Sequence, residues 1–356
     1  MNRIIHIIES SATGTLSIAN MAANEQAKDN NVTVVFSRRG DTPPNIKKMF
    51  SGNVSLIETE LQANKFPFSV FSLRRIIKTL SPDIVHCHSS FAGFVGRLAT
   101  IGLKVKVVYS PHCISFMRQD ISSFKRTLFK LFEKIGCLKN STYIACSQSE
   151  QDVIKAELPG SRVVLLENAV DLSDFRKELN VSTKIQRVIT VGGIRPQKGP
   201  EEFAKIAQSF EGSDVEFVWI GDGDLEYKQA LLDAGVVVTG WLPRQQVIEE
   251  LYQSDLYLST ARWEGMPVSI IEACAAGLPV VARNCDGNKD IINNKKNGLL
   301  FDTTECAIKY ISDCINDVNF ANQLANAANN QVFERFSIDR FHKQLSEIYK
   351  SSNRDH

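Results

Sequence analysis

Short runs of β-branched and apolar residues alternate with helix-patterned segments along most of the chain. Parallel strands joined by helices produce this alternation, because the crossover between two parallel strands is long enough to hold a helix. We predict strands at residues 4–8, 32–36, 54–57, 83–86, 105–109, 143–146 and 163–165, and again at 187–191, 215–220, 236–238, 255–258, 279–282 and 298–300. A polar segment, 171–186, separates the two series and is interpreted as a linker. The pattern predicts an α/β protein with two doubly wound parallel-sheet domains.

The length of the chain agrees with two domains. At 356 residues it exceeds the roughly 250–300 residues at which single cores stop growing. We place the domains at 1–170 and 171–337, followed by a helical segment at 338–356. The formal net charge of +1 provides no broad basic field, so we expect no nucleic-acid partner.

Cysteine spacing and the amino-terminal segment bear on the compartment. The 8 cysteines are scattered without Cys-x-x-Cys spacing, so we expect reduced core residues rather than disulfides or metal ligands. The apolar run within residues 1–9 is too short for a signal peptide, and no stretch is long enough to span a bilayer. These features lead us to expect a cytoplasmic protein.

Two glutamates with seven residues between them, Glu264 and Glu272, stand out in the segment 261–277. Residues 255–259 have the character of a buried strand, Pro267 suits a first helical position and Gly277 suits the position just past a helix end. We therefore expect Glu264 in a loop and Glu272 on the following helix.

The start of that helix is a candidate binding mouth. Its residues are Gly265, Met266, Pro267 and Val268. Free amides at a helix start donate to phosphate or sugar oxygens, and here a carboxylate stands on each side. Such a site suits a ligand that carries both hydroxyls and phosphates.

A glycine-containing loop, residues 191–199, lies between a predicted strand and a predicted helix. Its glycines allow the backbone to approach an anion, and Arg195 and Lys198 supply two cations near the helix start. The spacing matches neither the P-loop nor Gly-x-Gly-x-x-Gly, and an ordinary turn with two solvated charges is the alternative interpretation.

The order Glu-Gly-Met-Pro, then Glu272-Ala, then Gly277-Leu-Pro-Val-Val resembles the signature of the family 4 glycosyltransferases, retaining enzymes that use sugar nucleotides. The resemblance implies the GT-B fold: two Rossmann-like domains facing a central cleft, with the terminal helix crossing back to the first domain. It also implies sugar transfer from a nucleotide-diphosphate donor, with UDP expected, to a glycan or lipid-linked acceptor. We expect a step in bacterial surface polysaccharide biosynthesis, whether capsule, O-antigen, exopolysaccharide or lipopolysaccharide.

The same resemblance implies roles for the donor-side residues. Arg195 and Lys198 correspond to the cations that hold the donor diphosphate and stabilise it as a leaving group, although Arg195 stands closer to the lysine than in the family pattern. Glu264 would bind a sugar hydroxyl and Glu272 the ribose hydroxyls.

In the first half of the chain, the resemblance implies that His112 contacts the donor sugar near the reacting carbon. Residues 9–15 take the place of the family's glycine-rich loop but contain only Gly14, whose backbone could touch phosphate or acceptor. Cys113 and Ala169 replace usual glycines, which leaves the shape of both loops open. Two alternative functions remain open: a GT-B-like sugar-nucleotide epimerase and a degenerate, non-catalytic sugar-nucleotide-binding subunit.

Two short patterns raise the question of a metal. His86 and His88 would share one face of a strand, but no third ligand follows at suitable spacing, so a polar cleft lining is the favoured interpretation. Asp222 and Asp224 form an Asp-x-Asp pair, yet they precede a helix and suit a capping turn. We expect neither a metal nor any other cofactor.

Residues 123–139 form an amphipathic helical pattern, with cations at Arg126, Lys130 and Lys134 opposite an apolar face. The apolar face consists of Phe124, Leu128, Leu131, Phe132, Ile135 and Leu138. The pattern fits a helix lying on anionic lipid at the inner face of the plasma membrane, and it fits equally an ordinary docked helix with a solvated basic stripe.

Overall fold

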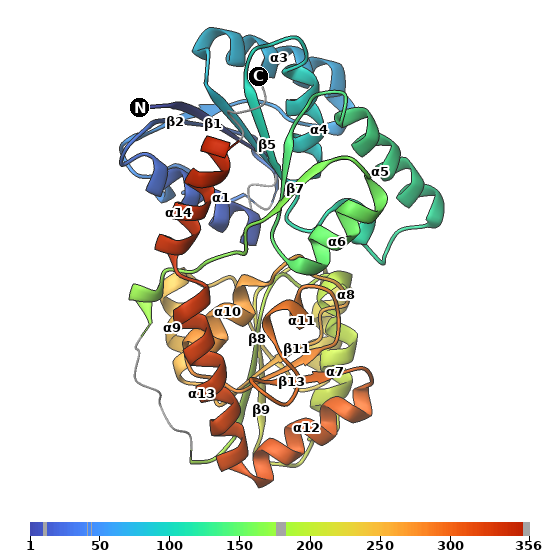
Figure 1. Cartoon of the computed structure of the whole chain (residues 1–356). Coiled ribbons are helices and arrows are strands. Elements are labelled where there is room, and N and C mark those ends of the chain that lie inside the picture. Colours follow the sequence, from blue (N-terminus) through green and yellow to red (C-terminus); the bar gives the residue numbers. More distant parts are fainter. Residues whose placement is uncertain (10–12, 41, 44, 176–182, 352–356) are drawn as a thin grey trace. The chain divides into compact units, whose positions relative to one another are not determined.

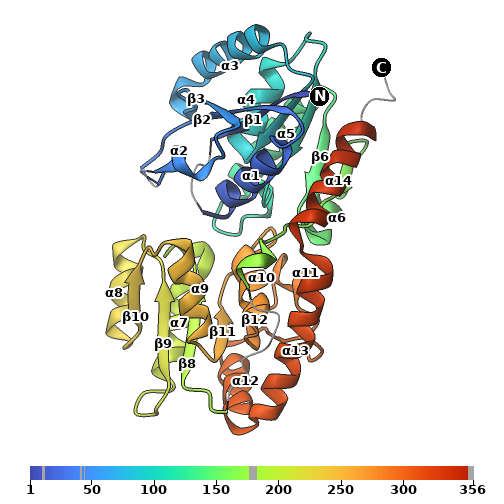
Figure 2. The same cartoon turned by 90° about the vertical axis from the view of Figure 1, so that its left-hand side faces the viewer.

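The computed structural model describes residues 1–9, 13–40, 42, 43, 45–175 and 183–351. These residues divide into two compact units, shown in Figures 1 and 2. Unit 1 comprises Met1–Asn168 and Asp339–His356, and unit 2 comprises Ala169–Ile338. Part of the predicted linker, residues 176–182, and residues 10–12 of the predicted glycine-rich loop lie outside the described residues.

Unit 1 is built on a seven-stranded parallel sheet with the order β3-β2-β1-β4-β5-β6-β7. Its strands are β1 (Arg3–Ile8), β2 (Asn31–Phe36), β3 (Val54–Glu58), β4 (Ile84–His88), β5 (Lys106–Ser110), β6 (Thr142–Ala145) and β7 (Arg162–Leu165). Its α-helices are α1 (Thr13–Gln26), α2 (Ile46–Met49), α3 (Phe66–Leu80), α4 (Ser90–Ala99), α5 (Ser123–Gly136), α6 (Gln148–Glu157) and α14 (Ile338–Ser351).

Unit 2 is built on a six-stranded parallel sheet with the order β10-β9-β8-β11-β12-β13. Its strands are β8 (Arg187–Val191), β9 (Glu216–Ile220), β10 (Val237–Gly240), β11 (Leu256–Ser259), β12 (Val280–Arg283) and β13 (Leu299–Phe301). Its α-helices are α7 (Pro200–Gln208), α8 (Leu225–Asp233), α9 (Arg244–Tyr252), α10 (Val268–Ala275), α11 (Asn288–Ile291), α12 (Thr304–Asn316) and α13 (Val318–Arg335).

Both sheets have the doubly wound strand order, so the predicted fold class is confirmed. Each series of predicted strands corresponds to one sheet, and each predicted run overlaps one observed strand. In both sheets the strand order reverses beside the first strand, between β1 and β4 and between β8 and β11. Ligands of such folds bind outside the carboxyl ends of the strands at this reversal.

The two faces of the unit 1 sheet differ in chemistry, because successive strand residues point to opposite faces. On one face, Val85 and Cys87 join a hydrophobic cluster that includes Leu73 of α3 and Val95 of α4. The opposite face carries a group of buried imidazoles, the histidine cluster, which consists of His6 on β1 with His86 and His88 on β4.

Helices α1 and α14 supply polar partners for the histidine cluster. Gln26 at the end of α1 lies with its Oε1 2.7 Å from His6 Nε2. The hydroxyl of Tyr349 on α14 lies 2.7 Å from His86 Nδ1, and Ser110 Oγ lies 2.8 Å from His86 Nε2. Burying a polar ring is tolerated where it is hydrogen-bonded, so these partners account for histidines in the interior.

Helix α5 is docked on unit 1 through the side that carries buried Glu133 and Gly136, and much of its apolar side faces outward. The exposed apolar side chains of this helix and the turn after it, the α5 apolar stripe, are Phe124, Leu128, Leu131, Phe132 and Leu138. The predicted solvated basic stripe is only partly correct. Lys134 is exposed, but Lys130 Nζ pairs with Glu157 Oε1 at 2.6 Å and Arg126 Nη2 donates to the Arg118 carbonyl at 3.1 Å.

No helix in the described ranges combines the length and the apolar character required to cross a membrane. The 8 cysteines all belong to the described part of the chain and form no disulfide there, and five of them are buried: Cys87, Cys146, Cys274, Cys285 and Cys314.

The histidine cluster predicts a pH dependence for the stability of unit 1. Burial lowers the pKa of His6 to about 4 and that of His86 well below its ordinary range. The unfolded chain therefore binds more protons than the folded chain between about pH 4 and 6.5, so stability falls as the pH is lowered through this window. For His6 alone, the change from 6.5 to about 4 corresponds to roughly 3 kcal/mol of unfolding free energy.

Urea titrations from pH 4 to 8 test this expectation, with one signal for each unit. The 3 tryptophans, Trp219, Trp241 and Trp263, lie in unit 2, so their fluorescence follows unit 2 while circular dichroism follows both units. The transition that circular dichroism detects and fluorescence does not reports the unfolding of unit 1. Its free energy of unfolding should decrease below pH 6.5, and it should decrease less in His6→Asn than in the control His342→Asn. Equal pH dependence in both variants would contradict the assignment.

Candidate functional site

The candidate site in unit 2 lies at the carboxyl ends of β8 and β11, where the strand order reverses. The loop after β8 contains Gly192, Gly193, Arg195 and Lys198, and the loop after β11 contains Glu264. Two of the predicted site segments, far apart in the sequence, therefore meet at one sheet edge.

The glycines after β8 make room for the two cations. A Cβ at Gly192 would lie 3.0 Å from Lys198 Cε, and a Cβ at Gly193 would lie 2.7 Å from Arg195 Nη2. Both cationic side chains thus fold back over consecutive glycines. The exposed Arg195 and the half-buried Lys198 converge at the end of β8, where an anion would meet two positive charges.

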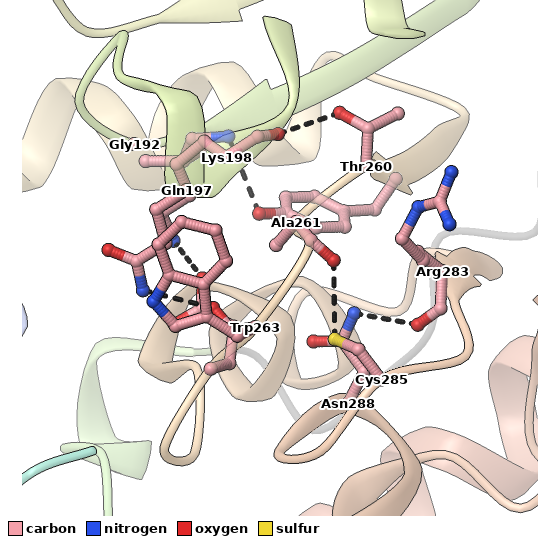
Figure 3. Close-up of polar contacts among 12 residues, drawn as sticks. Gly192, Gln197, Lys198, Thr260, Ala261, Trp263, Arg283, Cys285 and Asn288 are labelled. Carbon is pink, nitrogen blue, oxygen red and sulfur yellow. Dashed lines mark hydrogen bonds and ion pairs between the residues drawn. The ribbon is translucent and has the colours of Figure 1, made fainter. Parts of the chain in front are cut away.

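Lys198 is joined directly to Glu264. Its Nζ lies 2.6 Å from Glu264 Oε1, and Gln197 Nε2 lies 3.4 Å from the other carboxylate oxygen. Thr260 Oγ1 donates to the Lys198 carbonyl at 2.8 Å, which ties the two loops together (Figure 3). Although burial acts to lower the pKa of Lys198, the neighbouring carboxylate of Glu264 outweighs it and raises that pKa. Lys198 is therefore a persistent cation.

The backbone of Glu264 is held by the loop that precedes α11. Its amide donates to the Asp286 carbonyl at 3.2 Å. Gly287, with φ of 86°, lies so close that an added Cβ would be 2.7 Å from the Cβ of Glu264. Only glycine combines this left-handed backbone with such close approach.

Glu272 lies on α10, as predicted, and is buried. Arg244, at the start of α9, donates through Nη1 to Glu272 Oε1 and pairs with Asp174 Oδ2 at 3.0 Å. Burial raises the pKa of Glu272, while Arg244 opposes this effect by stabilising the carboxylate. The sequence analysis did not identify Arg244, because its link to Glu272 exists only once α9 and α10 are folded.

The helix that follows the predicted mouth is present, and it begins one residue later than predicted. Pro267 is the cap residue and Val268 begins the helix, whereas Gly277, with φ of 83°, follows the helix end as predicted. Gly265 and Met266 are buried, and Val268 is half-buried. Helix geometry leaves the first amides of α10 without partners inside the helix, so they point toward any ligand placed there.

In unit 1, the loop after β5 places His112 beside the histidine cluster. His88 Nδ1 lies 3.0 Å from His112 Nε2, and both His112 and Cys113 adopt positive φ, 54° and 84°. Buried Glu150 supports this conformation, because its Oε1 accepts from the amides of Cys113 at 2.9 Å and Ile114 at 2.8 Å. Cys113 thus adopts a left-handed backbone conformation that favours glycine, and the hydrogen bond from its amide to Glu150 stabilises this conformation.

The other predicted positions have mixed outcomes. Gly14 is an exposed residue in the first turn of α1, with open space around it. Ala169 is buried and has no positive φ, so alanine in place of the usual glycine causes no backbone strain there. Asp224 caps α8, as predicted, by accepting from the Glu226 amide, and Asp222 Oδ1 lies 3.1 Å from Lys228 Nζ.

The interpretation of His86 and His88 as a polar cleft lining is wrong, since both are buried. The structure also supplies a third histidine that sequence spacing could not reveal: His6 on the neighbouring strand brings three potential ligand atoms within 4.8 Å of one another. However, His6 Nδ1 and His88 Nε2 lie 2.9 Å apart as hydrogen-bond partners. Two ligands of a tetrahedral zinc ion stand about 3.3 Å apart, so the group fits a hydrogen-bonded cluster better than a metal site.

Comparison with known proteins agrees with this arrangement. Residues 15–174 match the family model described as Glycosyltransferase Family 4, and residues 172–331 match the one described as Glycosyl transferases group 1. The two matches adjoin near the boundary between the units, so each unit corresponds to one of the two domain types.

Individual relatives extend over most of the chain. It is 26% identical to an uncharacterised 41.2 kDa protein in the cps region of Klebsiella pneumoniae, covering 98% of this chain and 99% of that one. It is 28% identical to the UDP-Gal:alpha-D-GlcNAc-diphosphoundecaprenol alpha-1,3-galactosyltransferase of Escherichia coli, covering 79% and 78%. Anabaena Alr3699/HepE, solved in complex with UDP-glucose, has the same fold, with a TM-score of 0.80 at 19% identity over 99% and 100%. The chain belongs to the family 4 glycosyltransferases and has their GT-B fold.

Proposed function

We propose that this glycosyltransferase transfers a sugar from a UDP-sugar, with retention of configuration, to a glycan or lipid-linked acceptor in bacterial surface polysaccharide synthesis. The observation that carries the donor assignment is the meeting of Arg195 and Lys198 with Glu264 at the carboxyl ends of β8 and β11. Arg195 and Lys198 supply positive charge for a diphosphate, and Glu264 supplies a carboxylate that can accept from sugar hydroxyls.

The donor would be divided between two parts of the unit 2 site. The diphosphate would lie against Arg195, Lys198 and the first amides of α10, where cations and free N–H groups stabilise a leaving phosphate. Glu272 would accept from the ribose hydroxyls, with Arg244 favouring its charged form. Glu264 would accept from the transferred sugar. Binding of UDP-glucose by the structural neighbour supports a uridine nucleotide.

Retention would follow from attack on the face that the phosphate leaves. The bond between the anomeric carbon and the phosphate oxygen breaks, the acceptor oxygen bonds to the same face, and the acceptor proton passes to the departing phosphate. Positive charge that develops on the sugar would be stabilised by the nearby carboxylate of Glu264. The intact pair of Lys198 and Glu264 supports an active enzyme over a degenerate binding subunit.

A lipid-linked acceptor would be met at a membrane surface. The relative in Escherichia coli is named for a diphosphoundecaprenol acceptor. The α5 apolar stripe, with Phe124 78% and Leu131 51% exposed, offers side chains that can enter lipid, and exposed Lys125 and Lys134 stand beside it. Apolar insertion combined with flanking cations is the recognised means of binding anionic bilayers.

The roles of the two glutamates can be separated by calorimetry with free UDP. Glu272→Ala should weaken UDP by roughly 1.5–3 kcal/mol, about ten- to hundredfold, because charged hydrogen bonds to ribose are lost. Glu264→Gln should leave UDP affinity equal or slightly higher, since Lys198 is released from its ion pair, yet depress turnover. Equal weakening in both variants would refute this division. Unaltered turnover in both, or epimerised donor without acceptor, would refute the transferase assignment.

Donor binding should not depend on a divalent cation, because two protein cations already face the diphosphate. UDP-sugar binding and turnover are therefore expected to survive EDTA. The matched variant is Asp224→Asn, which retains the helix cap while removing the charge that a metal would need. Loss of turnover in EDTA that Mg²⁺ or Mn²⁺ restores, together with loss in Asp224→Asn, would instead identify Asp222 and Asp224 as ligands.

Membrane contact should depend on the α5 apolar stripe more than on the partly engaged cations. Replacing Phe124 and Leu131 together by Ser should lower binding to phosphatidylglycerol vesicles by at least about tenfold, because each exposed side chain loses favourable burial in lipid. Leu225→Ser, at an equally exposed apolar position in unit 2, is the control. Turnover of a water-soluble acceptor should be unchanged. Undiminished vesicle sedimentation would exclude α5 as the contact.

A further inference from the structure

Four side chains in unit 1 are joined in series by hydrogen bonds. Gln26 Oε1 lies 2.7 Å from His6 Nε2, His6 Nδ1 lies 2.9 Å from His88 Nε2, and His88 Nδ1 lies 3.0 Å from His112 Nε2. The rings of His6 and His88 are inclined by 20° and those of His88 and His112 by 11°, so the three imidazoles are nearly parallel. This series, the imidazole relay, runs from the end of α1 to the loop after β5.

Each imidazole of the relay is neutral near pH 7. Burial lowers the pKa of His6 and of His112 to about 4, and burial with the neighbouring histidines lowers the pKa of His88 well below its ordinary range. A neutral imidazole carries one ring proton, so one of its nitrogens donates and the other accepts. In a series of such rings, the tautomer of each determines the tautomer of the next.

The direction of the relay is set at Gln26. With Oε1 of the Gln26 amide facing the ring, this oxygen can only accept, so in this orientation His6 carries its proton on Nε2 and accepts at Nδ1 from His88. His88 therefore carries its proton on Nε2 and accepts at Nδ1 from His112. His112 is left with a proton on Nε2 and a lone pair on Nδ1. Within the described part of the chain, that Nδ1 makes no hydrogen bond.

We infer that Gln26, His6 and His88 are positioning residues that fix His112 as the Nε2–H tautomer and present its Nδ1 as a hydrogen-bond acceptor. Glu150 restrains the backbone on one side of the ring through the Cys113 amide, and His88 restrains the ring itself. The consequence for catalysis rests on the proposed function: next to a donor sugar, His112 Nδ1 would accept from a hydroxyl of that sugar. The opposite tautomer would present a donor and lose that acceptor.

The remaining histidine of the cluster stands beside the relay without interrupting it. Both nitrogens of His86 are occupied, by Tyr349 and Ser110, although its ring centroid lies 4.1 Å from that of His88. His86 therefore fills space next to the relay and leaves the sequence of proton positions unchanged.

Nitrogen-15 NMR of the histidine-labelled protein tests the inference directly, because ring nitrogens with and without a proton have distinct shifts. The chain has 6 histidines, so substitution assigns each signal. In the wild-type protein, His112 should be the Nε2–H tautomer and should not titrate between pH 5.5 and 8. Gln26→Leu, two rings away from His112, should produce a mixture of tautomers, as should His88→Leu. His342→Asn, outside the relay, should leave the His112 signals unchanged.

A second measurement connects the tautomer to the donor. Gln26→Leu should raise KM for the UDP-sugar by about twofold to tenfold, the range for one neutral hydrogen bond. Affinity for free UDP, which engages unit 2, should be unchanged. A merely structural defect would not raise the KM for the UDP-sugar while leaving the affinity for free UDP unchanged.

Three results would overturn the inference: an Nδ1–H tautomer of His112 in the wild-type protein, an unaltered tautomer in both Gln26→Leu and His88→Leu, or stoichiometric zinc on His6, His86 and His88. The wild-type spectrum is decisive even where a variant does not fold. If no sugar nucleotide binds the wild-type protein, the proposed function fails, while the spectrum still decides the relay.

Discussion

The ion pair between Lys198 and Glu264 holds together the two loops that form the candidate site of unit 2. These loops follow β8 and β11, which the reversal of strand order places side by side. The chain between them contains α7, α8 and α9, so the pair joins segments that are far apart in the sequence. A second ion pair, between Arg262 and Glu201 at 3.2 Å, lies close to it in the sequence. Because Glu264 keeps Lys198 protonated, the site holds a stable cation before any ligand arrives. Thr260 and Gly287 then fix the backbone positions from which the two side chains meet.

The candidate site of unit 2 and the histidine cluster of unit 1 satisfy their buried polar groups in different ways. Unit 2 buries carboxylates and pairs each with a cation: Glu264 with Lys198, and Glu272 with Arg244. An ion pair of this kind suits a site where a charged ligand must find matching charge. Unit 1 contains a buried ion pair as well, between Arg97 and Glu133, but its histidine cluster consists of uncharged imidazoles that are joined by hydrogen bonds.

Several errors of the sequence analysis have a common physical origin. The helical pattern of α5 identified its apolar face correctly, but not the side on which the rest of unit 1 lies. Buried Glu133, which accepts from Arg97 and Tyr109, anchors the opposite side of the helix and leaves the α5 apolar stripe in solvent. His86 and His88 were correctly placed on one strand face, yet that face is covered by α1 and α14. Helical and strand periodicities describe an element alone and carry no information on what packs against it.

The sequence by itself determined both sheets, since a run of β-branched residues followed by a helical pattern needs only local information to be recognised. It also determined the positions of Glu264 in a loop and Glu272 on a helix, because Gly277 marks the local boundary. Only the tertiary structure decided which side chains meet. Arg244 reaches Glu272, and His6 reaches His88, across 28 and 82 residues of chain. Such contacts arise when strand order and helix packing bring distant segments together, and no local pattern encodes them.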